Sequence, residues 1–160
     1  MRTIQLTRGF VAMVDDEDYA LASGFCWNPN ISKAGMVYAR TAIGPRANRH
    51  TITLHRLVLG TTVKIDHEDR NGLNCQKWNL RVCSQSQNMA NRPAPANNTS
   101  GFKGVARKGE RWRAYIGIDY RNIHIGLFDT PQEAAQAYDN AALHHFGEFA
   151  RTNQSLGLLT

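Results

Sequence analysis

A carboxylate, an imidazole and two carboxamides occur in one short stretch of the chain. Asp66 and His67 stand together, Asn79 follows His67 by 12 residues, and Asn88 follows Asn79 by 9. These residue types suit hydrolysis of a phosphodiester. Carboxylate and amide oxygens, here from Asp66 and Asn88, bind a hard cation such as Mg²⁺. A neutral imidazole accepts a proton from an attacking water, and a third polar group such as Asn79 can hold that imidazole in the useful orientation.

Local patterns predict a strand–strand–helix unit that positions these groups. Two short apolar runs, at 63–65 and 80–82, read as strands on either side of a polar loop. Ser84 and Gln87 have the spacing of a capping box, which begins a helix. Asn88 then falls in the next turn of that helix. The reactive groups are therefore expected at the end of the first strand, before the second strand and on the helix.

The ordered set resembles the HNH family of nucleases, whose active site is a ββα-metal motif. The resemblance covers roughly residues 50–92, and its pieces are Leu54-His55-Arg56-Leu57-Val58-Leu59-Gly60, Asp66-His67, Asn71-Gly72-Leu73-Asn74, Asn79-Leu80-Arg81 and Gln87-Asn88. It implies that His67 is the general base and that Asn79 is the central residue of the pattern. It also implies that Asp66 and Asn88 hold one Mg²⁺ or Mn²⁺ per active site.

The last position of the pattern is Asn88 rather than histidine, a variant that resembles the phage homing-endonuclease branch of the family. His55 either touches the phosphate or is structural, and Arg56 and Arg81 can each contact a phosphate. Other HNH proteins carry a zinc site made by four cysteines. This chain has three cysteines and no CxxC pair, so no structural zinc is expected.

A second pattern occupies the last third of the chain. Three strand-like runs, at 104–107, 112–118 and 123–128, are separated by turn-like breaks. Thr130, Pro131 and Glu133 then have the types and spacing that begin a helix, and alanines recur along it at helical spacing. The pattern predicts three antiparallel strands with one helix packed across them.

The predicted sheet is basic and the predicted helix is acidic. Residues 100–125 contain six Lys and Arg against two acids, whereas 126–149 contain four acids and no Lys or Arg. Phosphates are drawn to such a basic surface. Arg111, Arg113 and Tyr115 share one strand face, and arginine is well suited to reading guanine. The candidate DNA-contacting residues of this part are Lys103, Arg107, Arg111, Arg113, Tyr115 and Arg121.

Residues 100–153 resemble the AP2 DNA-binding domain of plant transcription factors. The matching pieces are Ser100-Gly101-Phe102-Lys103-Gly104-Val105, Trp112-Arg113-Ala114-Tyr115-Ile116, Ile125-Gly126-Leu127-Phe128-Asp129-Thr130, Glu133-Ala134-Ala135, Ala137-Tyr138-Asp139 and Phe146-Gly147-Glu148-Phe149-Ala150-Arg151-Thr152-Asn153. The resemblance implies that the sheet, and not the helix, enters the major groove of double-stranded DNA.

These features predict an α+β protein: a ββα-metal (HNH) nuclease module, then a three-stranded antiparallel sheet packed on one helix (AP2-like). The expected division is a nuclease module with a β-rich extension at 1–90, a linker rich in Pro and Asn at 91–100, and a DNA-binding domain at 101–155. The expected function is a metal-dependent DNA endonuclease of the homing or mobile-element type. A monomer with one active site, favoured over a homodimer, is expected to nick.

Two other classes of function stay open: a DNA-binding regulator with an inactive nuclease fold, and an RNA-binding or structural module. The net charge of +6 agrees with a polyanionic partner. An apolar run long enough to span a membrane is missing from the sequence. The odd number of cysteines argues against a disulfide scaffold and favours a reducing cytoplasm. The resemblance to homing or mobile-element nucleases implies that this is the cytoplasm of a bacterial or phage host cell.

Overall fold

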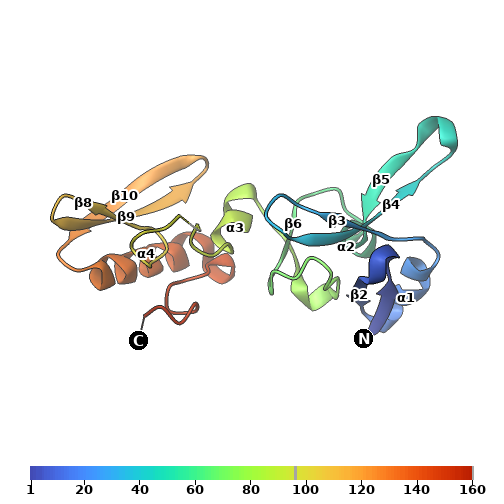
Figure 1. Ribbon diagram of the computed structural model, residues 1–160, viewed down its shortest axis with the longest axis horizontal. Helices are drawn as coiled ribbons and strands as arrows, with labels where there is room; N and C mark the ends of the chain where they lie inside the picture. Colours follow the sequence, from blue (N-terminus) through green and yellow to red (C-terminus); the bar gives the residue numbers. More distant parts are fainter. Residues whose placement is uncertain (96, 160) are drawn as a thin grey trace. The chain divides into compact units, whose positions relative to one another are not determined.

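The computed structural model describes residues 1–95 and 97–159, and it is a mixed α and β structure with several small antiparallel sheets. The predicted α+β composition is therefore confirmed. The chain divides into two compact units, Met1–Cys83 and Ser84–Thr160 (Figure 1). The segment expected as a linker, 91–100, falls within the second unit, and Ala96 in it lies outside the described residues. In the described part, no helix is long and apolar enough to cross a membrane.

The first unit contains seven strands and two α-helices, joined by short 3₁₀ turns. In chain order they are β1 (Arg2–Gln5), β2 (Val11–Val14), α1 (Asp16–Ser23), β3 (Asn28–Ile31), β4 (Val37–Ile43), β5 (His50–Thr53), α2 (Leu54–Leu59), β6 (Ile65–His67) and β7 (Leu80–Val82). β1 pairs with β2, β4 lies between β3 and β5, and β6 pairs with β7, all antiparallel.

Residues 1–49, whose role the sequence does not reveal, supply much of the core of the first unit. Trp27 is 1% exposed and packs among apolar side chains from β1, β2, α1 and α2. Its indole N–H donates to the carbonyl of Ala22 at 2.8 Å, so the largest side chain of this core is both buried and hydrogen-bonded. The N-terminal segment is therefore part of the same folded unit as the Asp66–His67 pair.

The residues of 51–55 have a strand-like pattern and predict one strand, but the chain changes from strand to helix after Thr53. Leu54 and Val58 stand one helical turn apart and are both buried in the core. Gly60, in the left-handed region with φ 59°, ends the helix and donates its N–H to the carbonyls of Arg56 and Leu57. His55 therefore lies in the first turn of a helix, and the strand prediction for it is wrong.

The polar loop between β6 and β7 is joined to the N-terminal part of the unit through its backbone. Met13 donates its N–H to the carbonyl of Leu73, and Cys75 donates its N–H to the carbonyl of Met13, both at 2.8 Å. Gly72 also approaches β4 closely: a Cβ at this position would lie 2.5 Å from the carbonyl oxygen of Val37. Only glycine fits there, and the loop is held between β2 and β4.

The second unit contains α3 (Gln85–Ala90), β8 (Val105–Lys108), β9 (Arg111–Ile118), β10 (Arg121–Phe128) and α4 (Pro131–Phe146). β9 is the central strand of an antiparallel sheet, with β8 and β10 at its edges. Figure 1 shows α4 lying along one face of this sheet. The three strands and the helix predicted for this part are therefore present.

Both predicted capping boxes form in the second unit. Ser84 accepts from the N–H of Gln87 at 3.1 Å, and the Gln87 side chain accepts from the N–H of Ser84 at 2.8 Å. Thr130 and Glu133 make the same reciprocal pair at the start of α4. Small side chains on α4 let it approach the sheet closely; Val105, Ala114, Ala134 and Ala135 are the buried residues of that core.

Candidate active site and nucleic-acid interface

His67 is the last residue of β6 and is 4% exposed. Its ring lies beside two other aromatic rings, with centroids 5.0 Å from His55 and 5.7 Å from Tyr38. Burial lowers the pKa of His67 to about 4, although the negative charges of Asp69 and Asp66 partly oppose this effect. The imidazole is therefore neutral at neutral pH, which is the form that can accept a proton.

Asp66, next to His67, forms a buried ion pair with Arg81. The two residues are opposite each other in the β6–β7 register, and Arg81 Nη2 lies 2.6 Å from Asp66 Oδ2. Their side chains are only 6% and 10% exposed, so solvent weakens this attraction little. A second, looser pair joins Arg81 to Glu68 at 3.8 Å. Arg81, expected on a phosphate, is thus bound to the carboxylate predicted to hold the metal.

Asn79 is fully buried and holds the polar loop through side-chain hydrogen bonds. Its Nδ2 donates to Asp69 Oδ1 at 2.9 Å and to the carbonyl of Asn74 at 2.8 Å, while its Oδ1 accepts from the N–H of Asp69 at 2.9 Å. The sequence predicts that Asn79 holds the imidazole. Its side-chain hydrogen bonds instead go to the loop that begins two residues after His67, so any effect on His67 acts through that loop.

Acidic residues of α1 hold the turn that precedes Asn79. Asp15 accepts from Gln76 Nε2 at 3.0 Å and from the N–H of Lys77 at 2.7 Å, and these bonds lower its pKa. Lys77 also pairs with Glu17 and Asp18. The residue type and position of Asp15 predict a cap for α1, but it stands at the N-cap position without a side-chain bond to that helix. The sequence contains no local signal for a partner 62 residues away.

His55, at the start of α2, faces His67 from the other side of the site. Its Nε2 lies 3.0 Å from the hydroxyl of Thr53, and its Nδ1 is buried with no hydrogen-bond partner in the described structure. Burial lowers the pKa of His55 to about 3, with the charges of His67 and Arg56 adding to the effect. Arg56 itself is exposed. His55 therefore lies beside His67, and its contact with a phosphate stays a prediction.

Asn88, the second predicted metal ligand, lies in α3 and belongs to the second unit. It is half-buried, and its N–H donates to the carbonyl of Ser84 as part of the helix. Its place as a ligand beside Asp66 therefore stays a prediction. The chain changes from one unit to the other at Ser84, within the segment predicted as a single ββα motif.

The outer face of β9 carries the arginines predicted to contact DNA. Arg111 and Arg113 are exposed, whereas Ala114 and Ile116 on the other face are buried. Arg113 lies over the ring of Tyr115 at 5.0 Å, which supports its side chain on an aromatic surface. Arg111 donates to Asp129 at 2.9 Å; both partners are more than half exposed, so this pair is easily exchanged for a phosphate.

The two flanking strands contribute further cations. Arg107, on β8, lies over the Trp112 ring at 5.3 Å, and Arg121 is exposed at the start of β10. Lys103, by contrast, is 8% exposed, and its amine donates to the carbonyls of Ala90 and Arg151. The structure thus gives Lys103 an internal structural role. In the strand register Arg107 lies opposite Trp112 and Arg121 lies opposite Ile118, so both belong to the side of the sheet that carries Ala114 and Ile116. The basic face of the sheet is therefore formed by Arg111 and Arg113, with Tyr115 beside them.

Three proteins show what this chain is similar to. HNH endonuclease L560 of Acanthamoeba polyphaga mimivirus is 28% identical over 151 residues, which is 92% of this chain and 76% of that protein. APETALA2-like protein 2 of rice is 46% identical over 61 residues. That match covers 36% of this chain but only 14% of the plant protein. No family model matches the chain.

The fold and the relatives together define a mixed α and β protein with likeness to an HNH endonuclease and to AP2 DNA-binding proteins. A third relative has a higher identity to this chain than the mimivirus protein has, over a shorter length. Protein 3.8 of Escherichia phage T7 is 35% identical over 89 residues, which cover 54% of this chain and 73% of the phage protein. The chain belongs to the family of this phage protein.

Proposed function

We propose that this protein is a divalent-cation-dependent DNA endonuclease of the HNH type that hydrolyses one phosphodiester of duplex DNA per engagement. The observation that carries the proposal is His67: a buried, neutral imidazole at the end of a short hairpin, next to a buried carboxylate. The likeness of nearly the whole chain to an HNH endonuclease supports it. The homing or mobile-element type follows from Asn88 at the last position of the motif.

In the proposed reaction, His67 accepts a proton from water as the water oxygen attacks the phosphorus. The new phosphorus–oxygen bond forms while the bond to the 3′ oxygen breaks. The charges of Asp66 and Asp69 favour the imidazolium that results. Asn79 keeps the loop carrying Asp69 in place, so the geometry around His67 does not depend on a mobile segment.

The donor atoms predicted for the cation fit a hard ion. Asp66 offers carboxylate oxygens and Asn88 an amide oxygen, which are the ligands that Mg²⁺ and Mn²⁺ take in proteins. Such an ion, when bound, polarises the phosphate and stabilises the departing 3′ oxygen. Arg81, already paired with Asp66, holds the carboxylate in a fixed orientation and shares it with the cation.

The basic face of the second unit is proposed to hold the duplex. The exposed guanidinium group of Arg111 on β9 supplies a phosphate contact, and Arg113 on the same strand is the main candidate for reading bases. The likeness to a rice APETALA2-like protein supports DNA as the partner. One proposed active site per chain then gives a nick, and cutting both strands needs a second engagement.

A DNA-binding regulator is the second candidate, because the plant relatives match this chain with higher identity than the endonuclease does. Both functions use the basic sheet to bind DNA, and they differ only in whether His67 supports hydrolysis. Binding with no hydrolysis is the outcome that favours the regulator.

The deciding experiment is a nicking assay on supercoiled plasmid and genomic DNA, with Mg²⁺ or Mn²⁺ against EDTA. It is run beside His67→Ala and a matched control, His50→Ala, which removes an exposed histidine of the same unit. We expect cation-dependent nicking that His67→Ala abolishes and His50→Ala retains. Nicking by both variants would refute the role of His67. Binding in a gel-shift assay without nicking would favour the regulator.

A further inference from the structure

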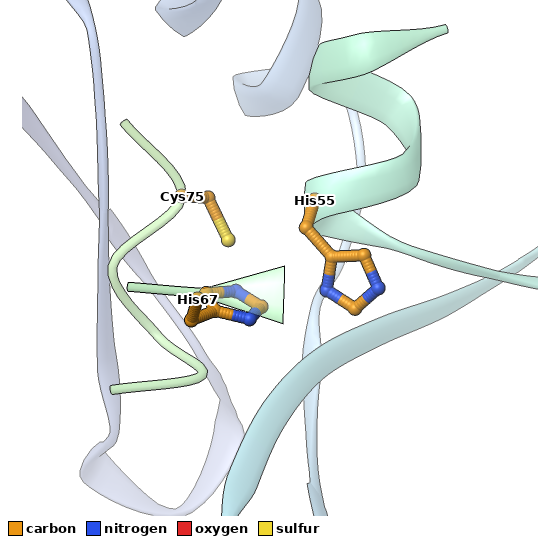
Figure 2. A group of neighbouring side chains, drawn as sticks. All are labelled: His55, His67 and Cys75. Carbon is orange, nitrogen blue, oxygen red and sulfur yellow. The ribbon is translucent and has the colours of Figure 1, made fainter. Parts of the chain in front are cut away.

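We propose that His55, His67 and Cys75 form a binding site for one transition-metal ion of the Zn²⁺ or Co²⁺ type. Each side chain offers one donor atom, and the three donor atoms all lie within 4.8 Å of one another. Figure 2 shows the Cys75 sulfur pointing toward the His67 ring, with the His55 ring standing beside it. Two imidazoles and a thiolate suit a borderline-soft metal, not Mg²⁺.

The separations are close to those of a bound ion. Bonds of about 2.0 Å to nitrogen and 2.3 Å to sulfur put the donors of one tetrahedral zinc roughly 3.5 Å apart. Side-chain movements of about 1 Å therefore close the site around a metal. Three protein ligands leave a fourth position for water, so the site differs from the four-cysteine zinc site that this chain lacks.

The surroundings orient His55 toward such an ion. Thr53 occupies its Nε2, and this leaves Nδ1 as the buried nitrogen with no partner in the described structure. A ligand histidine commonly has its other nitrogen fixed in this way by a hydrogen bond. A buried nitrogen without a hydrogen bond destabilises the folded protein, and a metal ion bound to Nδ1 would remove this destabilisation.

Cys75 is the third residue of the proposed site, and its position is fixed by burial and by a backbone hydrogen bond. It is fully buried, and its N–H donates to the carbonyl of Met13 at 2.8 Å. Burial, with the negative charge of Asp69 adding to it, raises the pKa of Cys75 to about 12, so the thiol keeps its proton until a metal displaces it. The same negative charge attracts a cation bound by Cys75 and His67. Binding replaces the proton of the thiol with the metal, so one proton is released for each ion bound.

The site has a consequence for catalysis that rests on the proposed function. A metal on the His67 ring occupies the lone pair that would accept the proton of the attacking water. The transition metal would therefore inhibit the proposed nuclease even while Mg²⁺ is present. The same three residues would give the enzyme a metal-controlled off state.

The direct test is a titration of the full chain with Co²⁺ after removal of metals by EDTA and buffer exchange. Cys26→Ser and Cys83→Ser are introduced together as the background, so that Cys75 is the only thiol. His144→Gln and His145→Gln in this background exclude the exposed pair of histidines on α4. Tryptophan fluorescence and circular dichroism confirm that each variant is folded.

We expect a thiolate-to-cobalt charge-transfer band and visible d–d bands that saturate at one equivalent. The bands should disappear with Cys75→Ser and with His55→Gln. Thr53→Val, which removes only the hydroxyl on His55, should weaken binding by about 10- to 100-fold. Absence of the bands in the background protein, or their survival in Cys75→Ser, would overturn the proposal and leave a packed cluster without a metal.

A second measurement tests the inhibition separately. One equivalent of Zn²⁺ is added to the nicking assay in Mg²⁺ buffer, with the background protein and with its Cys75→Ser derivative. We expect nicking to fall in the first and to persist in the second, and equal loss in both would refute the off state. Because the Co²⁺ bands are recorded without DNA, a protein that binds Co²⁺ but never nicks would refute the nuclease and retain the metal site.

Discussion

Replacement of Asn79 by alanine tests whether this residue acts on the loop or on the imidazole. The change removes one hydrogen bond to the Asp69 carboxylate, one to the Asn74 carbonyl and one from the Asp69 N–H. Asn79 and Asn74 are buried, whereas Asp69 is exposed and can turn to water. A net value near 1 kcal/mol for each bond gives an expected loss of about 3 kcal/mol in the free energy of unfolding.

The assay is urea unfolding followed by the fluorescence of Trp27, with Trp78→Phe and Trp112→Phe as background. Trp27 is then the only tryptophan, and its 1% exposure in the core of the first unit makes its emission report that unit alone. The matched control is Asn71→Ala in the same loop. Asn71 is exposed and its side chain accepts a single bond, from the N–H of Leu73, so we expect a loss below about 1 kcal/mol.

The two readings of Asn79 differ in outcome. If Asn79 holds the loop in place, Asn79→Ala lowers the urea midpoint and also reduces nicking. If Asn79 acted on His67 alone, nicking would fall while the urea midpoint stayed in place. A loss of stability smaller than that of Asn71→Ala would refute the argument from hydrogen bonds.

Three further outcomes follow from the same structure. In EDTA, lowering the pH from 7 to 5 should reduce the free energy of unfolding of the first unit by on the order of 2 kcal/mol per histidine. The unfolded histidines bind protons below a pKa of about 6.5, whereas burial lowers the pKa of His67 to about 4 and that of His55 to about 3 in the folded unit. Urea unfolding measures this loss, and a constant midpoint would contradict it. Asn153→Ala should destabilise the second unit by about 3 kcal/mol in urea unfolding, with Gln154→Ala, an exposed neighbour, near neutral. Arg111→Ala should weaken binding to a duplex and reduce the slope of log affinity against log salt by about one in an anisotropy titration, and an unchanged slope would remove it from the phosphate contacts.

The parts of the fold that the sequence predicts are those set by a few neighbouring residues. The capping boxes at Ser84 and Thr130 each depend on residues three positions apart, and both form. The two faces of β9 follow from alternation along a single strand, and Ala114 and Ile116 are buried as that alternation requires. Such signals need no knowledge of the rest of the chain.

The parts that the sequence does not predict depend on contacts between distant segments. Asp15 has the type and position of a helix cap, but a backbone N–H from Lys77 competes successfully for its carboxylate. Lys103 is a cation in a basic stretch, yet carbonyl oxygens inside the second unit surround its amine. In each case the residue type allows two partners, and the tertiary structure selects between them.

The approach of Cys75 to His55 and His67 has the same origin. No spacing in the sequence links a cysteine in a polar loop with a histidine in the first turn of α2. The loop reaches the histidines because its backbone joins β2 and because Gly72 lets it lie against β4. A short strand ladder formed by the N-terminal segment therefore decides what surrounds the proposed catalytic base.

Both units close around a fully buried asparagine that is bonded in the same pattern. Asn79 and Asn153 each accept one backbone N–H, and each donates to a carboxylate and to a backbone carbonyl. In each unit the amide therefore uses both its donor and its acceptor groups inside the fold, beside a carboxylate that is exposed for Asp69 and buried for Asp139. Aspartate at either position could not donate and would stand beside another carboxylate, Asp69 or Asp139. The presence of Asn79, the central residue of the nuclease pattern, is therefore explained first by folding, and its effect on catalysis follows from the loop that it holds.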